Sequence, residues 1–424
     1  MYKLSCIFLC ILKFSYITYS QADSTYSKGD TAAPENTFKQ QDVKDWMAKR
    51  KSKEVKPPKD NFLFIIPYIS ANPTAGFMIG AGLTYTYKLR KTDQYLSVIS
   101  SAVSYSTNKF INANIKSNMF VFKERLFLNG DWRFLVNGET TYGLGTSSTL
   151  PNETNIDDSP ISKDSVGQKL KYNQIRIHET GSYKLFKNFF AGIGIQFDHF
   201  YNISDDALNK GDTALSHHYQ YSIHNGFDPK NYTTFGVSLN FLFDSRDNQV
   251  NAYRGYYANL NYRVNLTGLG STKNSTVLLT EFRSYYPLDG IKQRHILGFW
   301  LYGNFVTTGY SPYLALPALG YDQRQRTGRG YKFGQFRGEN MMYGEMEYRF
   351  PISMQSGILG GVLFINSTST SDKKNNVQLF DFLKQGYGGG LRIMLDKTSR
   401  SRLEVDAGLS KNTFGFYLGV QETF

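Results

Sequence analysis

The chain has 424 residues and carries 48 Lys and Arg against 35 Asp and Glu, a net charge of +13. Aromatic residues make up 16 %, with 31 Tyr and 32 Phe, and there are 38 Gly. This composition excludes a helical bundle, which uses Ala, Leu and Glu, and intrinsic disorder, which lacks aromatic residues. The mean hydropathy of −0.40 excludes a polytopic helical membrane protein. Because the basic residues form no compact block, the positive charge does not indicate nucleic-acid binding.

The N-terminus has the pattern of a secretory signal peptide. Lys3 precedes the apolar run Leu4–Leu12, which is too short to span a bilayer. Small residues allow cleavage after residue 20, which defines a signal at 1–20, or two positions later. Cys6 and Cys10 both lie in this segment, so the mature chain is expected to hold no thiol and no disulfide. No later segment has the uninterrupted apolar length of a transmembrane helix.

Residues 21–60 are polar and rich in Lys, Ser, Thr and Pro, which predicts a flexible arm in the periplasm. The arm ends at Pro57-Pro58 and contains one helix candidate, Gln40–Lys53 (QQDVKDWMAKRKSK). The remaining residues, 61–424, form the second predicted unit.

From Asn61 onward the hydrophobic pattern has a period of two, which is typical of β-strands. In Tyr256–Leu266 and in Arg402–Ser410, apolar residues alternate with polar and charged ones. A soluble β-sandwich would also alternate. Three features favour a membrane barrel instead: strands long enough to cross a bilayer at a tilt, a polar opposite face suited to a wet lumen, and connections that alternate between short and long.

The pattern predicts an all-β fold, a 16-stranded antiparallel transmembrane β-barrel with short periplasmic turns and long extracellular loops. The segments are 61–69, 76–89, 94–106, 109–122, 125–137, 168–185, 188–203, 232–245, 255–267, 274–287, 293–307, 341–352, 358–367, 386–396, 401–410 and 413–424. The long connections, which all fall on one side, are 138–167, 204–231, 308–340 and 368–385. An even strand count with both ends in the periplasm is what a bacterial outer-membrane barrel requires. The predicted location is therefore the outer membrane of a Gram-negative bacterium.

The C-terminal half resembles a known family. Thr327–Ile352 has the sequence TGRGYKFGQFRGENMMYGEMEYRFPI. A loop with Arg-Gly-aromatic, then a strand ending in Glu-x-Arg-Phe-Pro, looks like the bacterial surface antigen superfamily, which includes BamA, TamA and the two-partner secretion transporters. FDSRDN at 243–248, followed by Arg254-Gly255, is similar to the family's periplasmic turn after the eighth strand. GVLFINS at 361–367 and GYGGGLRIML at 386–395 resemble its thirteenth and fourteenth strands.

The resemblance implies a set of functional residues. In the family the loop folds back into the lumen and its Arg pairs with acidic residues of the wall, so Arg329 is expected beside Glu347. The predicted residues are Arg329, Gly330 and Tyr331 in the lumen; Glu345, Glu347 and Asn366 on the barrel wall; Asp244, Arg246, Asp247 and Gly255 in the periplasmic turn; and Phe424 as the sorting signal. Two positions depart from the family: Gly328 replaces an aliphatic residue, and Asn366 replaces a carboxylate but can still accept a hydrogen bond. Arg324 and Arg326 are expected on an exposed stretch of the loop.

The sequence predicts no enzyme, no cofactor and no metal site. His217, His218 and His224 lie near acidic residues in a long loop, where solvated side chains are the default over a metal site. His178 and His295 lie in predicted strands, without the Gly-x-Ser-x-Gly turn of an acyl hydrolase.

The resemblance implies a function in protein insertion or secretion. Family members receive their clients through periplasmic POTRA domains, for which residues 21–60 are too short. We therefore expect an accessory protein for insertion or translocation, in contact with outer-membrane lipids and with periplasmic or outer-membrane assembly proteins. A structural or binding barrel and a passive porin-type channel are the alternatives. Nucleic acid is not an expected partner.

The seam that closes the barrel is expected to be weak. The first strand contains Pro67, which cannot donate a ladder hydrogen bond. The last strand contains Gly415 and Gly419, and is expected to run to Phe424 with its apolar side chains on one face. A seam paired over only a few residues would support insertion over passive conduction. The alternative is that Pro67 marks the rim of a fully paired seam.

Overall fold

The structure is a computed structural model that describes residues 40–50, 61–72, 76–147, 149–154, 160–162, 167–205, 216–289, 295–420 and 422–424. The chain divides into two compact units, Met1–Thr37 and Phe38–Phe424. The first unit lies outside the described residues, and with it the predicted signal peptide and both cysteines. Everything below concerns the second unit.

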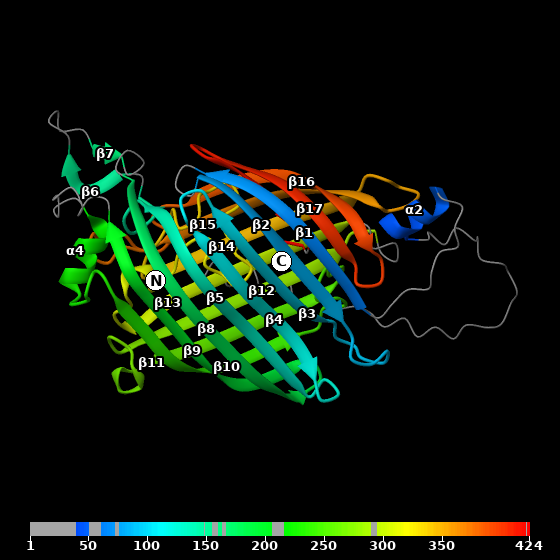
Figure 1. Ribbon diagram of the computed structural model, residues 1–424, viewed down its shortest axis with the longest axis horizontal. Helices are drawn as coiled ribbons and strands as arrows, with labels where there is room; N and C mark the ends of the chain where they lie inside the picture. The colour runs from blue at the N-terminus through cyan, green and yellow to red at the C-terminus, as the bar shows by residue number, and fades with distance from the viewer. Residues whose placement is uncertain are drawn as a thin grey trace, which may run out of the picture. The chain divides into compact units, whose positions relative to one another are not determined.

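Among the described residues, sixteen strands form one antiparallel sheet, in which each strand pairs with its neighbours along the chain (Figure 1). The strands are β1 (Asn61–Asn72), β2 (Gly76–Tyr87), β3 (Ser97–Ser106), β4 (Ile111–Val121), β5 (Leu126–Thr141), β8 (Gln168–Phe186), β9 (Phe189–Asp205), β10 (Tyr232–Asp244), β11 (Gly255–Asn265), β12 (Ser275–Pro287), β13 (Ile296–Gly309), β14 (Asn340–Pro351), β15 (Leu359–Thr370), β16 (Lys384–Asp396), β17 (Ser401–Ser410) and β18 (Phe414–Gly419). The predicted 16-stranded barrel is confirmed. A second small sheet, β6 (Thr149–Thr154) with β7 (Pro160–Ser162), lies in the β5–β8 connection and was not predicted.

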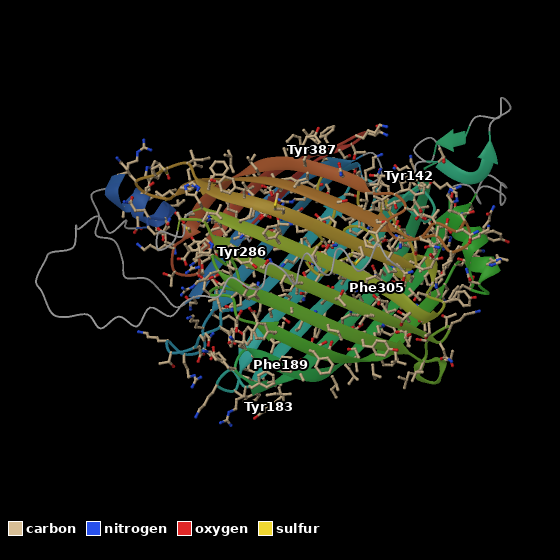
Figure 2. The ribbon with its side chains drawn as sticks, turned by 180° about the vertical axis from the view of Figure 1, so that it is seen from behind. Tyr142, Tyr183, Phe189, Tyr286, Phe305 and Tyr387 are labelled. Atoms are coloured by element: carbon tan, nitrogen blue, oxygen red, sulfur yellow. The ribbon has the colours of Figure 1, made fainter. Side chains whose placement is uncertain are left out.

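The period of two in the sequence becomes an inside and an outside face of the barrel. In β10, Leu239 and Phe241 are exposed on the outer face, whereas Asn240 and Leu242 are buried on the inner face. Successive side chains of a strand point to opposite faces, so one register fixes all of them. The rings of Tyr183, Tyr286 and Tyr387 project from the outer face (Figure 2). This apolar outer face is suited to lipid.

The barrel has two unlike ends. One end carries short connections such as Arg90–Asp93 and is here called the turn end; the other carries the long connections and is called the loop end. Helix α2 (Val43–Arg50) lies at the turn end, and α4 (His217–His224) lies at the loop end with β6 and β7 (Figure 1). None of the helices in the described part of the chain is long and apolar enough to cross a membrane.

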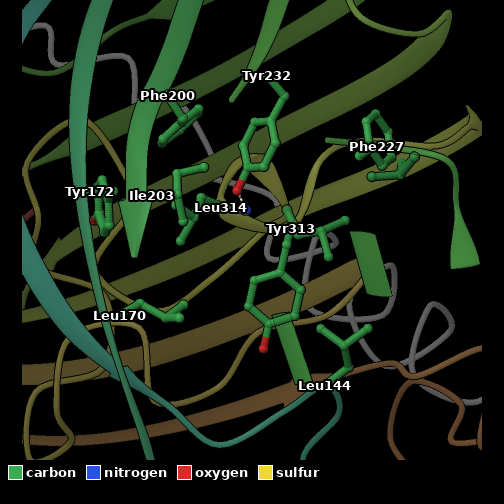
Figure 3. Close-up of a cluster of buried hydrophobic side chains, with 11 residues drawn as sticks. Leu144, Leu170, Tyr172, Phe200, Ile203, Phe227, Tyr232, Tyr313 and Leu314 are labelled. Atoms are coloured by element: carbon green, nitrogen blue, oxygen red, sulfur yellow. Dashed lines mark hydrogen bonds between the residues drawn. The ribbon is translucent and has the colours of Figure 1, made fainter. Parts of the chain in front are cut away.

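The β13–β14 connection, residues 310–339, enters the barrel from the loop end. The 3-10 helix η4 (Tyr313–Ala315) anchors it, because the fully buried Tyr313 and Leu314 pack against rings of β8, β9 and β10 (Figure 3). The Leu314 N–H donates to the Tyr232 hydroxyl over 3.1 Å. His218 of α4 meets the Tyr313 ring edge-on, with 5.5 Å between ring centroids. Burial lowers the pKa of His218 to about 3, so this imidazole is neutral.

The end of the chain differs from the sequence prediction. β18 stops at Gly419, and Phe424 is buried inside the barrel instead of continuing the outer face. The Phe424 ring stacks on Trp300, with centroids 5.5 Å apart, and its main-chain oxygen accepts from Arg349 over 3.1 Å. Gly298 leaves room for this ring, since a Cβ there would lie 3.2 Å from it. The prediction that Val420 and Phe424 share the exposed face of Phe416 is therefore wrong.

A sixteen-stranded membrane barrel is expected to resist sodium dodecyl sulfate until it is heated. We expect unheated protein from washed membranes to migrate differently from boiled protein in gel electrophoresis, because the intact ladder keeps the barrel compact. Recovery of the protein in the soluble fraction after a carbonate wash would contradict the membrane barrel.

Candidate functional site in the barrel lumen

The side chains of β14 alternate between the inner and the outer face of the barrel. Glu345, Glu347 and Arg349 are buried on the inner face, while Met346 is exposed on the outer face, as the sequence predicts. Arg349 donates to Glu347 over 2.6 and 2.8 Å, so two side chains on the same face of β14 already form an ion pair. Of the two carboxylates on this strand, only Glu345 has no arginine partner on β14 itself.

Arg329 of the β13–β14 loop fills that position. Its guanidinium is fully buried and donates to Glu345 over 2.5 Å, and it also donates to Glu347. A third carboxylate, Asp406 of β17, accepts from its other amino group over 2.7 Å. The ring of Phe364 lies 3.6 Å below the guanidinium carbon. Arginine suits this place because its planar fork can serve several carboxylates at once.

Glycines allow the loop to approach the wall. Gly328 and Gly330 have φ of 87° and 101°, which non-glycine residues rarely adopt. At Gly386 of β16, a Cβ would lie 2.7 Å from the Arg329 main-chain oxygen. The departure of Gly328 from the family pattern thus matches a left-handed turn.

Asn366 and Tyr331 hold the main chain of the loop. The Asn366 amide donates to the Arg329 main-chain oxygen over 2.9 Å, instead of accepting from the guanidinium as the sequence suggested. Tyr331 donates its hydroxyl hydrogen to the main-chain oxygen of Gln385 over 2.6 Å. Asp406 takes the place of the carboxylate that is absent at position 366. The polar face of Arg402–Ser410 was the available signal for Asp406, but nothing in the sequence says which wall carboxylate faces the loop.

The pairing continues beyond Arg329 into a larger network. Arg392 of β16 donates to Glu422 over 2.7 Å and also to Asp406. The network, which joins five arginines to five carboxylates, consists of Arg326, Arg329, Arg349, Arg392, Arg402, Glu345, Glu347, Glu404, Asp406 and Glu422. Equal numbers of opposite charges are what a desolvated cluster needs, because an unpaired buried ion is costly.

Two arginines of the loop are not where the sequence placed them. Arg326 was expected in solvent, but it pairs with the buried Glu404. Arg324 was also expected in solvent, but it lines the lumen and donates to the main-chain oxygen of Glu422 over 3.0 Å. The loop crosses the lumen as a series of turns, and Arg324 and Arg326 both face the wall or the last residues of the chain.

The predicted turn motif forms a second plug, at the turn end. Asp244 accepts from the Arg246 guanidinium over 2.8 and 2.9 Å, and Gly255 has φ of 106°. Asp247 accepts from Arg400 of the β16–β17 turn over 2.7 Å. The connection spans the mouth, because Gln249 accepts from the Leu96 N–H beside β3, over 2.8 Å.

In the described residues, the first and the last strand of the sheet are not joined by a ladder of main-chain hydrogen bonds. In the described part of the chain, β1 pairs with β2 and β18 pairs with β17, and no ladder joins β1 to β18. Side chains meet there instead: Phe62 and Val420 pack in one buried cluster, with Val43 of α2 against it.

Helix α2 lies across the turn end of this seam. Within the arm predicted to be flexible, the structure describes residues 40–50, and the predicted helix is found at Val43–Arg50. Asp45 accepts from Lys397 of the β16–β17 turn over 2.7 Å, and Lys44 donates to Asp396 over 3.1 Å. The Lys44 amine also lies 4.8 Å from the centre of the Phe62 ring. The helix therefore bridges the first strand and the last strands.

The model of the Omp85 superfamily domain matches residues 74–424. The chain belongs to the Omp85 superfamily. Among solved structures, CdiB from Acinetobacter baumannii is similar, with a TM-score of 0.50 and 11 % identity over 85 % of this chain and 59 % of that one. BamA from Haemophilus ducreyi lacking POTRA domains 1–3 has a TM-score of 0.49 and 14 % identity over 86 % of this chain and 70 % of that one. No curated protein sequence matches the chain.

The CdiB likeness shows the fold alone, and this Omp85 chain spans less than two thirds of that CdiB chain. Within the described residues, no group of three or more His, Cys, Asp and Glu side chains is placed to hold a metal ion. His178 contacts Asp198 over 2.8 Å, but that carboxylate also accepts from Arg176 and Arg263. The His178–Asp198 pair therefore belongs to an ion-pair cluster of the wall.

Reversing the charge of Arg329 should destabilise the barrel strongly. Arg329→Glu leaves the buried Glu345 without its cation and leaves Glu347 and Asp406 with one cation each. Breaking one side of a buried pair costs about 3–5 kcal/mol. Arg254→Glu, at an exposed turn position, is the matched control and should cost about 0–1 kcal/mol. Urea unfolding in detergent, followed by tryptophan fluorescence, compares the two. Equal midpoints for both variants would contradict the buried network.

Removing the cation that holds α2 should release the helix. Lys397→Glu replaces two hydrogen bonds to Asp45 by repulsion, a loss of about 1–2 kcal/mol. Chymotrypsin cleavage after Trp46 should then be about 5–30-fold faster, since cleavage follows the population of the opened helix. Lys374→Glu, at an exposed position of the loop end, should leave the rate unchanged. Unaltered cleavage in Lys397→Glu would mean that other contacts hold the helix.

Proposed function

We propose that this Omp85 barrel lies in the outer membrane with its turn end in the periplasm, and assists the insertion or translocation of proteins. Membership of the superfamily supports the class of function. The single observation that carries the proposal is the seam, where β1 and β18 face each other without a ladder in the described part of the chain. Each edge strand presents unpaired main-chain groups, which can template an added strand.

The residues of the seam explain its weakness. β18 pairs with β17 over only six residues, Glu404–Leu409 against Phe414–Gly419. Pro67 in β1 removes one donor from the opposite edge. Among the described residues, the edges are joined by the buried cluster of Phe62, Leu395 and Val420 and by helix α2, neither of which depends on ladder hydrogen bonds. Such a seam can open at the cost of a few side-chain contacts.

A passive porin-type channel fits the lumen less well. The β13–β14 loop crosses it from the loop end, and the β10–β11 connection spans the turn end. Between them lie two neighbouring chambers of about 180 and 140 Å³, both lined by Gln323 and Arg324. A conducting pore of this strand number would need a continuous aqueous opening.

The outer face and the turn end supply the proposed partners. Exposed apolar side chains such as Ile193 and Phe416 would contact lipid tails. At the turn end, α2 leaves Trp46 and Met47 exposed, where a periplasmic or outer-membrane assembly protein could bind. A purely structural barrel would also need the lipid-facing side chains, but not the exposed Trp46 and Met47 at the turn end.

The proposal is tested by linking the seam. Phe62→Cys and Val420→Cys, in a chain with Cys6→Ser and Cys10→Ser, can be joined by a short bis-maleimide because the two positions pack in one cluster. The protein is reconstituted in liposomes, and a urea-unfolded eight-stranded outer-membrane barrel is added as the client. The unlinked protein should speed client insertion several-fold, measured by the heat-modifiable client band, and linking should abolish this effect.

The control link joins Val405→Cys to Leu418→Cys, which are already partners in the β17–β18 ladder. It should leave client insertion unchanged, since that pair does not need to separate. Full activity of the protein linked at positions 62 and 420 would argue against an opening seam, and no acceleration by the unlinked protein would argue against the insertion function itself.

A further inference from the structure

Among the described arginines that face the lumen, Arg324 differs from the others because it has no carboxylate partner. The lumen-facing arginines with a carboxylate oxygen within 4.0 Å are Arg133, Arg176, Arg246, Arg263, Arg283, Arg326, Arg329, Arg337, Arg349, Arg392 and Arg402. No carboxylate of the described residues lies that close to Arg324. Its guanidinium donates to one main-chain oxygen, that of Glu422, over 3.0 Å.

The neighbours of Arg324 add to its positive field. Arg246 and Arg283 both pack on the ring of Tyr257, with guanidinium carbons 4.6 and 4.7 Å from its centre. Each of these two arginines pairs with a carboxylate on its own strand or turn, so three guanidinium groups share two carboxylates. Burial, and then repulsion by Arg283 and Arg246, lowers the pKa of Arg324 to about 10.

Arg324 lines a polar chamber of about 180 Å³ between the loop and the inner wall. A single water needs about 10–15 Å³ measured this way, so the chamber has room for several waters or one small anion. Asn259, Asn261 and Thr234 contribute polar groups to its lining. The chamber therefore combines an uncompensated cation with side chains that can donate hydrogen bonds.

The carboxylates that line the chamber are already engaged. Asp131 pairs with Arg133 at 2.6 Å, Asp198 with Arg176 at 2.6 Å, and Glu281 with Arg283. Asp322 accepts from the main-chain N–H groups of Arg326 and Thr327 and is turned into its own loop. None of them compensates Arg324.

Near Arg324 lies a second cation whose partner is neutral. Lys116 of β4 lines a neighbouring chamber of about 140 Å³, to which Arg324 also contributes. Its amine donates to the side-chain oxygen of Gln325 over 3.0 Å, which is a neutral partner. Among the described residues no carboxylate lies within 4.0 Å of this amine.

We propose that the luminal chamber beside Arg324 binds a small oxyanion, a phosphate or carboxylate group, held by the Arg324 guanidinium with Arg283 beside it. Guanidinium groups bind such anions through two parallel N–H donors. The anion would give Arg324 the oppositely charged partner that it lacks among the described residues. This site is independent of whether the seam opens, so the proposal does not rest on the insertion function.

The test is thermal unfolding of the purified full-length barrel in detergent, with sodium phosphate compared to sodium chloride at equal ionic strength. Wild-type protein should show a saturable rise in Tm with phosphate of about 1–3 °C, because a ligand of the folded state stabilises it. Arg324→Gln should abolish the rise. In chloride, this variant should be as stable as wild type or more so, since it removes an unpaired, partly buried charge. A merely structural Arg324 would instead lower Tm in both salts.

Arg254→Gln, at an exposed position, is the matched control and should keep the full phosphate response. Arg324→Met is a second neutral variant. An undiminished response in Arg324→Gln, or failure of both neutral variants to fold, overturns the proposal. Two probes distinguish the source: stabilisation by inorganic phosphate indicates a free anion, and stabilisation only by dihexanoyl phosphatidate indicates a lipid headgroup. Stabilisation by neither overturns the proposal.

Discussion

The structure depends on the pairing of charges that have been taken out of water inside the barrel. Arg329 is the centre of this pairing, because one buried guanidinium serves Glu345, Glu347 and Asp406 from two different strands. Without these carboxylates the guanidinium would be an uncompensated buried charge, and without the guanidinium Glu345 would be one. The loop that carries Arg329 is therefore held across the lumen, and it decides how much of the lumen is filled.

The same pairing divides the barrel into a part with many inter-strand contacts, here called the stiff part, and a part with few. β13 to β17 are joined by long ladders and by the network that includes Arg349 and Arg392. β18 is short, and its far edge has no ladder partner among the described residues. The inward turn of Phe424 strengthens this contrast, because the last residues pack on Trp300 and Arg349 of the stiff part instead of extending the edge.

The two ends of the barrel are plugged by different connections. The β10–β11 connection ties Asp247 to Arg400 across the turn end, while Tyr313 anchors the loop at the loop end. Motion of a client through this lumen would require the rupture of many ion pairs. Passage or insertion at the side, where Phe62 and Val420 meet without a ladder, needs fewer contacts to break. Helix α2 spans that contact, so in the proposed function it would have to move when the seam opens.

The sequence by itself determined the sixteen strands, their inner and outer faces, and the entry of Arg329 into the lumen. The first two follow because alternation with a period of two is a local property of an extended chain. The third came from the resemblance carried by Thr327–Ile352. Only the tertiary structure decided that Asp406, 77 residues from Arg329, completes the site, that Arg324 faces a chamber, and that Phe424 turns inward. These three features depend on which side chains of the inner face meet once the sheet curves. No local pattern in the sequence encodes contacts between residues so far apart in the chain.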